Sequence, residues 1–212
     1  MKVAKSTMLL YAVTDRTWLG NSTLAEQVEQ AIKGGATLVQ LREKHLDFKA
    51  FLEQAEELKK VTDRYRIPLI INDNIEVALA CDADGVHVGQ DDMAAGAVRA
   101  RIGEDKIIGV SAETVEQAVQ AEKNGADYLG VGAIFPTSTK LDTEPVTFDT
   151  LKTICSAVSI PVVAIGGINE QNIMQLKGSG IAGVAVVSAI FAQPDIMAAA
   201  SRLADLARKA VE

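Results

Sequence analysis

Short apolar runs recur along the chain, and each is bounded by Gly, Asn or Asp. The runs are nearly continuous rather than alternating, which is typical of parallel strands covered by helices. They predict eight strands, at 8–14, 37–41, 68–72, 84–88, 106–110, 127–132, 161–166 and 183–187.

Segments with helical periodicity separate these runs. The segment 22–35 opens with a hydroxyl cap and stops at Gly34-Gly35, and 47–65 repeats its apolar residues with a period close to 3.6. Comparable patterns predict further helices at 93–103, 114–125, 169–180 and about 195–210.

Eight strands that alternate with helices predict the α/β class. The predicted fold is a (β/α)8 TIM barrel, and the chain length is near the small end of the range for that fold. The 212 residues fit one domain, 1–212, since no Pro- or Ser-rich linker interrupts them. A doubly wound open sheet is the alternative. It lacks its usual support, because neither a G-x-G-x-x-G nor a P-loop motif is present.

Composition narrows the function. Hydrophobic residues make up 48% of the chain, enough for a sizeable core, and the net charge of −7 argues against nucleic-acid binding. No run approaches the roughly 20 apolar residues of a membrane span, and no signal peptide is recognisable. Cys81 and Cys155 are far apart, so we expect reduced, buried thiols in a cytoplasmic protein. The sequence leaves homo-oligomerisation open.

Charged residues follow the second strand in the run "QLREK" (40–44). Gln40, Arg42 and Lys44 are spaced by two, so an extended chain would place them on one face at the barrel mouth, where barrel enzymes have their active sites. An ordinary strand end fraying into solvent would show the same spacing.

Two carboxylates follow the third and fourth strands. Asp73 and Asp92 could face one another across neighbouring strands and bind Mg²⁺, which takes one or two carboxylates together with substrate phosphates. Alternatively each is only a helix cap, and Glu76 lies three residues after Asp73 as in a capping box. His87 we interpret as a hydrogen-bonded core residue, since no second nearby His would complete a zinc site.

Hydroxyls and glycines follow the later strands. Ser111 ends the fifth strand, and "FPTSTK" (135–140) places three hydroxyls beside a lysine after the sixth. Gly166-Gly167 and Ser188 follow the seventh and eighth strands, where barrels frequently bind phosphate. Close packing of helix on strand is the alternative for these small residues. With the cations and carboxylates, this pattern fits pyrophosphate with Mg²⁺ at one region and a monophosphate at another.

These motifs resemble those of the thiamin phosphate synthase (thiamin-phosphate pyrophosphorylase) family, in the same order, over essentially the whole chain. The pair "HVGQDD" and "PTSTK" is specific in combination. The motifs that carry the resemblance are "QLREK", "IINDN", "GVHVGQDD", "GVSA", "FPTSTK", "AIGGI" and "VVSAI".

The resemblance implies a transferase of thiamin, and hence thiamin diphosphate, biosynthesis. Such an enzyme joins 4-amino-5-hydroxymethyl-2-methylpyrimidine pyrophosphate to 4-methyl-5-(2-phosphoethyl)thiazole. Pyrophosphate leaves first and a pyrimidine methyl cation is captured by the thiazole nitrogen. Carried over, Asp73 and Asp92 would bind Mg²⁺, and Arg42, Lys44, Ser111 and Lys140 would act on the departing pyrophosphate. The substrate-binding set would be Gln40, Arg42, Lys44, Asn72, Ser111, Thr137, Thr139, Lys140, Gly167, Val187 and Ser188.

One position departs from the family pattern. Many members carry His two residues after the strand-5 Ser, and this chain has Glu113 there. A thiazole tautomerase of the same fold, one alternative, relies on that His, so Glu113 argues against it. A non-catalytic regulator that binds thiazole phosphate is a second alternative, which would need no metal pair. A sugar-phosphate epimerase is a third, and it would need acid/base residues in the core.

Overall fold

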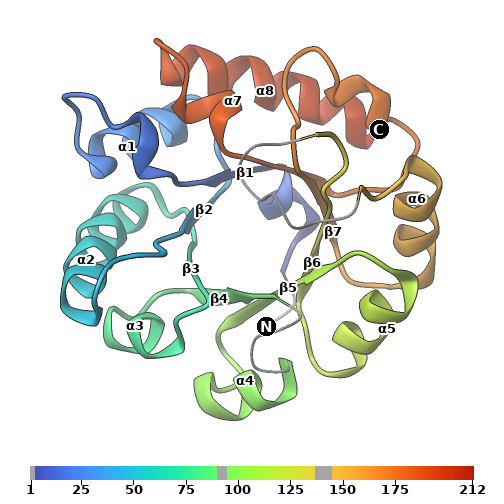
Figure 1. Cartoon of the computed structure of the whole chain (residues 1–212), viewed down its shortest axis with the longest axis horizontal. Helices are drawn as coiled ribbons and strands as arrows, with labels where there is room; N and C mark the ends of the chain where they lie inside the picture. The colour runs from blue at the N-terminus through green and yellow to red at the C-terminus, as the bar shows by residue number, and fades with distance from the viewer. Residues whose placement is uncertain (1–2, 90–94, 137–144) are drawn as a thin grey trace.

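The computed structural model describes residues 3–89, 95–136 and 145–212, and within them eight parallel strands close into a barrel in chain order (Figure 1). β1 pairs with β8 as well as with β2, with Tyr11 opposite Ala185 at the closure. The predicted TIM barrel and all its predicted strands are confirmed. The strands are β1 Leu10–Val13, β2 Leu38–Leu41, β3 Leu69–Asn72, β4 Gly85–Val88, β5 Ile107–Ala112, β6 Tyr128–Val131, β7 Val162–Ile165 and β8 Gly183–Val186.

The helices form a ring outside the barrel (Figure 1). Two begin with complete capping boxes, in which Thr23 pairs with Glu26 and Thr114 pairs with Gln117, and these fix where α1 and α5 start. The α-helices are α1 Leu24–Lys33, α2 Phe48–Tyr65, α3 Ile75–Ala80, α4 Ala95–Ile102, α5 Val115–Lys123, α6 Phe148–Ala157, α7 Ser188–Phe191 and α8 Ile196–Val211; short 3₁₀ helices are η1 Lys5–Met8, η2 Arg16–Trp18 and η3 Ile173–Leu176.

The helix predicted over 169–180 was wrong, because this segment contains only the single 3₁₀ turn η3. Asn169 and Asn172 accept hydrogen bonds from nearby backbone N–H groups through their side chains, which competes with helix formation. Gly178 and Gly180 then take positive φ values of 82° and 89° and end the segment. The connection from β7 to β8 is therefore compact, and α8 contacts η3 from outside.

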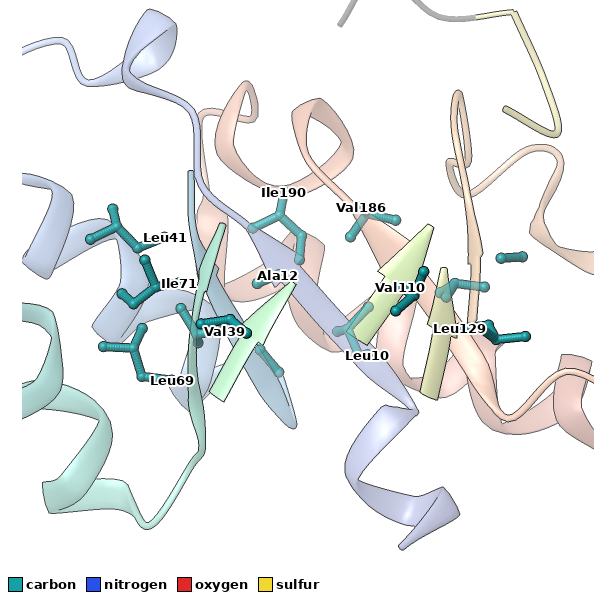
Figure 2. Packing of buried hydrophobic residues seen from close by; sticks show 14 of the residues in the cluster. Leu10, Ala12, Val39, Leu41, Leu69, Ile71, Val110, Leu129, Val186 and Ile190 are labelled. Carbon is teal, nitrogen blue, oxygen red and sulfur yellow. The ribbon is translucent and has the colours of Figure 1, made fainter. Parts of the chain in front are cut away.

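Buried side chains form two clusters, one inside the barrel and one between the strands and the helices. On β1, Leu10 and Ala12 belong to the outer cluster and Tyr11 and Val13 to the inner one, as the two-residue period of a strand requires. Figure 2 shows outer-cluster residues such as Val39 on the strands. The alternation decides which side chain at each strand end faces the barrel mouth.

Both cysteines are free thiols. Cys81 is buried as predicted, but Cys155, on α6, is half-buried where it packs against the outer cluster, so the prediction was wrong for that residue. Burial raises the pKa of both thiols, that of Cys155 to about 11. No helix among the described residues is both long and apolar enough to cross a membrane.

Candidate active site

A cavity of about 340 Å³ lies at the carboxyl ends of the strands. It is large enough for a small phosphorylated ligand. Thr137, Thr139, Lys140 and Asp92 lie outside the described residues, so their places in the site stay predictions. The predicted site residues that line the cavity are Gln40, Arg42, Lys44, Asn72, Asp73, Ser111, Gly167, Val187 and Ser188.

The end of β2 supplies the cationic side of the cavity. Gln40, Arg42 and Lys44 all line it, as their spacing predicts, and Gln40 is only 4% exposed. The Arg42 backbone N–H donates to Thr14 Oγ1 at 3.1 Å, which fixes the chain where the strand ends. One guanidinium and one ammonium group therefore line the same cavity, which can hold an anion.

Glu43 lies on the opposite face of the same segment. Its side chain is 5% exposed, and its Oε1 lies 3.5 Å from Arg16 Nη1. Burial raises the pKa of the Glu43 carboxyl above its ordinary value, against the lowering effect of Arg16. The ion pair ties the loop after β1 to the end of β2, on the side of β2 away from the cavity.

The end of β3 places Asn72 and Asp73 on the cavity wall. Asp73 has a left-handed backbone, with φ of +61°, and its N–H donates to the His87 carbonyl oxygen on β4 at 2.8 Å. Asn74, not Asp73, caps α3 by accepting from the Val77 N–H at 2.9 Å, so the capping interpretation of Asp73 was wrong. The Asp73 carboxylate accepts instead from the Asn72 side chain.

The donor set suits Mg²⁺ better than a metal that needs a closed protein cage. No group of three or more His, Cys, Asp or Glu side chains that could hold a metal occurs in the described ranges. Asp73 faces the cavity with a carboxylate, and Mg²⁺ needs only one or two carboxylates when substrate phosphates and water complete its shell.

Ser111 and His87 lie next to each other on β5 and β4. Ser111 Oγ is 3.0 Å from His87 Nε2, and His87 Nδ1 is 2.9 Å from the Tyr128 hydroxyl. His87 is 9% exposed, so the prediction of a hydrogen-bonded core histidine is confirmed. Glu113 lines the cavity at the position where the family pattern often has His.

Glycines shape the side of the cavity formed by β7 and β8. Gly167 has φ of +63°, and a Cβ on it would lie 2.8 Å from the Phe135 carbonyl oxygen, so only glycine fits here. The Asn172 side chain donates to the Gly167 carbonyl at 2.9 Å and holds the loop. Gly167, Val187 and Ser188 thereby form part of the wall of the same cavity that Arg42 and Lys44 line.

Sequence reasoning missed several residues that line the cavity. Tyr11 faces into it from β1 with a buried hydroxyl, and Val13, Ala133 and Ile168 add apolar surface. The period-2 alternation within each strand was the available signal for Tyr11. Because its polar partners lie on other strands, that signal alone could not assign it a function.

Fold and cavity together define a barrel enzyme whose site, at the carboxyl ends of its strands, is lined by cations, hydroxyls, a carboxylate and glycines. A family model described as thiamine monophosphate synthase matches residues 10–190. The chain belongs to this family, as its sequence motifs predict.

Similar proteins agree with this assignment. The thiamine-phosphate synthase of Ruminiclostridium cellulolyticum is 57% identical over 197 residues, which cover 93% of this chain and 94% of that protein. The Clostridium tetani enzyme of the same name is 55% identical, with 92% and 93% covered. A solved structure of thiamine phosphate pyrophosphorylase from Pyrococcus furiosus superimposes with a TM-score of 0.90 at 36% identity, covering 98% of this chain and 99% of that one. The activity is that of a thiamine-phosphate synthase, a transferase of thiamine biosynthesis.

Proposed function

We propose that this cavity joins a pyrimidine pyrophosphate to a thiazole phosphate and releases pyrophosphate. The observation that carries the proposal is that cationic side chains after β2 and a glycine-containing wall after β7 and β8 line one cavity. Arg42 and Lys44 would hold the pyrophosphate, and Gly167, Val187 and Ser188 would hold the thiazole phosphate. A site for the thiazole phosphate alone would not account for the two cations. A site for the pyrophosphate alone would not account for the wall after β7 and β8.

The proposed reaction needs charge stabilisation and positioning rather than a strong base. The bond between the pyrimidine methylene carbon and the pyrophosphate oxygen breaks, and its electron pair leaves with pyrophosphate. The thiazole nitrogen then donates its lone pair to that carbon and forms the new C–N bond. Arg42, Lys44 and Ser111 would stabilise the negative charge on the leaving oxygens, together with Lys140, which follows β6 in the sequence. Gln40 and Asn72 would orient the pyrimidine pyrophosphate, and Thr137 and Thr139 would line the thiazole phosphate site.

Asp73, together with Asp92, would hold Mg²⁺. The bound ion would neutralise charge on the pyrophosphate group. The proposal is supported by the Asp73 carboxylate on the cavity wall and by its fixed backbone, which holds it beside Asn72.

The test is pyrophosphate release by the purified protein, with each of the pyrimidine pyrophosphate, the thiazole phosphate and Mg²⁺ left out in turn. We expect release at the full rate only when all three are present. Isomerisation of a thiazole phosphate carboxylate without release would favour the tautomerase. Tight thiazole-phosphate binding with neither reaction would favour the regulator, and either result would contradict the proposal.

We also propose a cytoplasmic location, which the free state of Cys81 and Cys155 supports, because thiols stay reduced in that compartment. A homo-oligomer is compatible with this assignment. Fractionation and sedimentation of the native protein would test the two points.

A further inference from the structure

A continuous chain of hydrogen-bonded side chains runs across the barrel interior, and all its members except Tyr128 line the cavity. Gln40 Nε2 donates to the Tyr11 hydroxyl at 2.7 Å, and the Tyr11 and Tyr128 hydroxyl oxygens are 2.8 Å apart. His87 Nδ1 then lies 2.9 Å from the Tyr128 hydroxyl, and His87 Nε2 lies 3.0 Å from Ser111 Oγ. The chain thus links β2, β1, β6, β4 and β5 and ends at a residue of the proposed site.

The barrel is shaped to accommodate this chain. Tyr11 is 2% exposed and Tyr128 is 0% exposed, so water does not compete for their hydroxyls. A Cβ on Gly109 of β5 would lie 2.5 Å from His87 Nδ1, so a glycine there leaves the imidazole room beside Tyr128. Burial raises the pKa of each tyrosine hydroxyl well above the ordinary value for tyrosine. Each hydroxyl therefore keeps its proton.

Given the Gln40 amide that starts it, one direction of donation along this chain of hydrogen bonds satisfies every link in turn. In that direction Tyr11, which accepts from Gln40, gives its single proton to Tyr128, its other partner among the described residues. In the same direction Tyr128 donates to His87 Nδ1, which lies 2.9 Å from its hydroxyl oxygen. With Nδ1 acting as acceptor, a neutral His87 carries its proton on Nε2 and donates it to Ser111.

We infer that Tyr11, Tyr128 and His87 are positioning residues that fix the tautomer of His87 and thereby aim the Ser111 hydroxyl proton away from His87, at a pyrophosphate oxygen of the substrate. Ser111 uses a lone pair toward His87, so its own proton is committed to a different acceptor. In the opposite direction Ser111 would donate to His87 and could only present lone pairs to an anion. This inference rests on the proposed function of Ser111.

The first test is the protonation of the His87 ring nitrogens, read by long-range ¹H–¹⁵N NMR of the whole, unliganded protein. The protein has two histidines, His45 and His87. His45 is exposed and serves as an internal reference. We expect a proton on Nε2 of His87 and none on Nδ1. A proton on Nδ1 would overturn the inference, because the chain would then run from Ser111 toward Gln40.

The second test is a double-mutant cycle between Tyr128→Phe and Ser111→Ala, measured as kcat. Loss of Ser111 should lower kcat about 10²–10³-fold, as expected for one donor to developing charge. Tyr128→Phe should lower kcat about 10–100-fold, by analogy with the loss of the hydrogen-bond partner of a metal-ligating histidine. In the Ser111→Ala background Tyr128→Phe should change kcat less than about twofold, because both changes remove one effect. Losses that multiply would overturn the inference.

Tyr65→Phe is the matched control. It also removes a hydroxyl, which donates to Glu29 Oε1 at 2.7 Å, but at the contact between α1 and α2 outside the barrel. We expect its kcat to equal that of the unchanged protein. If Tyr128→Phe fails to fold, Tyr11→Phe breaks the same chain of hydrogen bonds one link earlier. It should likewise change kcat less in the Ser111→Ala background than in the unchanged protein.

The two tests separate the inference from the proposed function. If Ser111→Ala keeps full activity, the proposed role of Ser111 in the reaction is wrong, whereas the NMR result still decides the direction of the chain. If Ser111→Ala is impaired but His87 carries its proton on Nδ1, the proposed function stands and the positioning inference falls.

Discussion

Asp73 has a backbone conformation that few residue types adopt readily. Its φ of +61° is in the left-handed region, where Asp and Asn are enriched among non-glycine residues. The Asp73 N–H bond to the His87 carbonyl stabilises this conformation and ties β3 to β4 just where both strands end. Local strain of this kind is often found at functional sites.

Asp73→Asn tests the carboxylate without disturbing that backbone, because Asn tolerates the same conformation. We expect the rate of pyrophosphate release to fall by about 10²-fold or more as charge stabilisation is lost, with an unchanged unfolding temperature. Asp205→Asn, on α8, removes an exposed carboxylate and should leave the rate unchanged. Full activity of Asp73→Asn at every Mg²⁺ concentration would rule out the proposed metal site.

For individual residues, the sequence predicted the features that depend on local spacing. Gln40, Arg42 and Lys44 share a wall because side chains alternate along a strand. The choice between Asp73 and Asn74 as the cap of α3 was not predictable, since both are good capping residues. The contact between Tyr11 and Tyr128 joins residues 117 positions apart, which no local pattern reveals.

Arg99 of α4 joins three elements at the end of the barrel opposite the cavity. Its guanidinium donates to the carbonyls of Gly103, Lys106 and Gly125 and to the Asp127 carboxylate, at distances of 2.6–3.1 Å. Asp127 also accepts from the Ile108 N–H at 2.8 Å. The pair thereby fixes α4 against the starts of β5 and β6, and only 13% and 12% of the two side chains are exposed.

Arg99→Ala should lower the free energy of unfolding by about 3 kcal/mol, because it removes the cation paired with a largely buried carboxylate. Its kcat at 25 °C should stay close to that of the unchanged protein, since the cavity is at the other end of the strands. Arg101→Ala, on the same helix, breaks an exposed pair with Glu76 and should cost less than about 1 kcal/mol. Denaturant unfolding of both variants measures the two losses in free energy of unfolding. Equal losses would contradict the larger contribution assigned to the Arg99–Asp127 pair.

Elements were predictable where sequence periodicity and caps agreed. The strands and α1, α2 and α5 follow their patterns closely, because apolar faces and capping residues act together. The segment 169–180 failed because asparagine side chains and glycine backbones act against the helix that its apolar spacing suggests. Such competition is not visible in periodicity alone.

The whole barrel depends on how its first and last strands meet. β8 pairs with β1 in parallel, and Gly183 packs directly against the chain at Met8 and Leu9. A Cβ on Gly183 would lie 2.6 Å from the Leu9 carbonyl oxygen, and a backbone atom cannot move aside cheaply. The sequence predicted eight strands, but the tight approach that closes them arises only once the ring forms.

Gly183→Ala should therefore lower the thermal unfolding midpoint, through a loss of about 1–3 kcal/mol from overpacking. Gly96→Ala is the matched control. It lies on the exposed side of α4, where a Cβ would meet, among the described residues, only the Asn124 carbonyl oxygen at 3.7 Å. This change should raise stability by about 0.5–1 kcal/mol through helix propensity. A Gly183→Ala protein as stable as the original would contradict the closure argument.

The most direct measurement is the turnover of Arg42→Ala in pyrophosphate release, compared with Arg208→Ala. Arg42 lines the cavity, while Arg208 is an exposed residue of α8 paired with Asp205. If the cavity is where pyrophosphate departs, Arg42→Ala should lose about 10²–10³-fold in turnover while Arg208→Ala stays unchanged. Equal turnover in the two variants, with both folded, would contradict the assignment of this cavity as the active site.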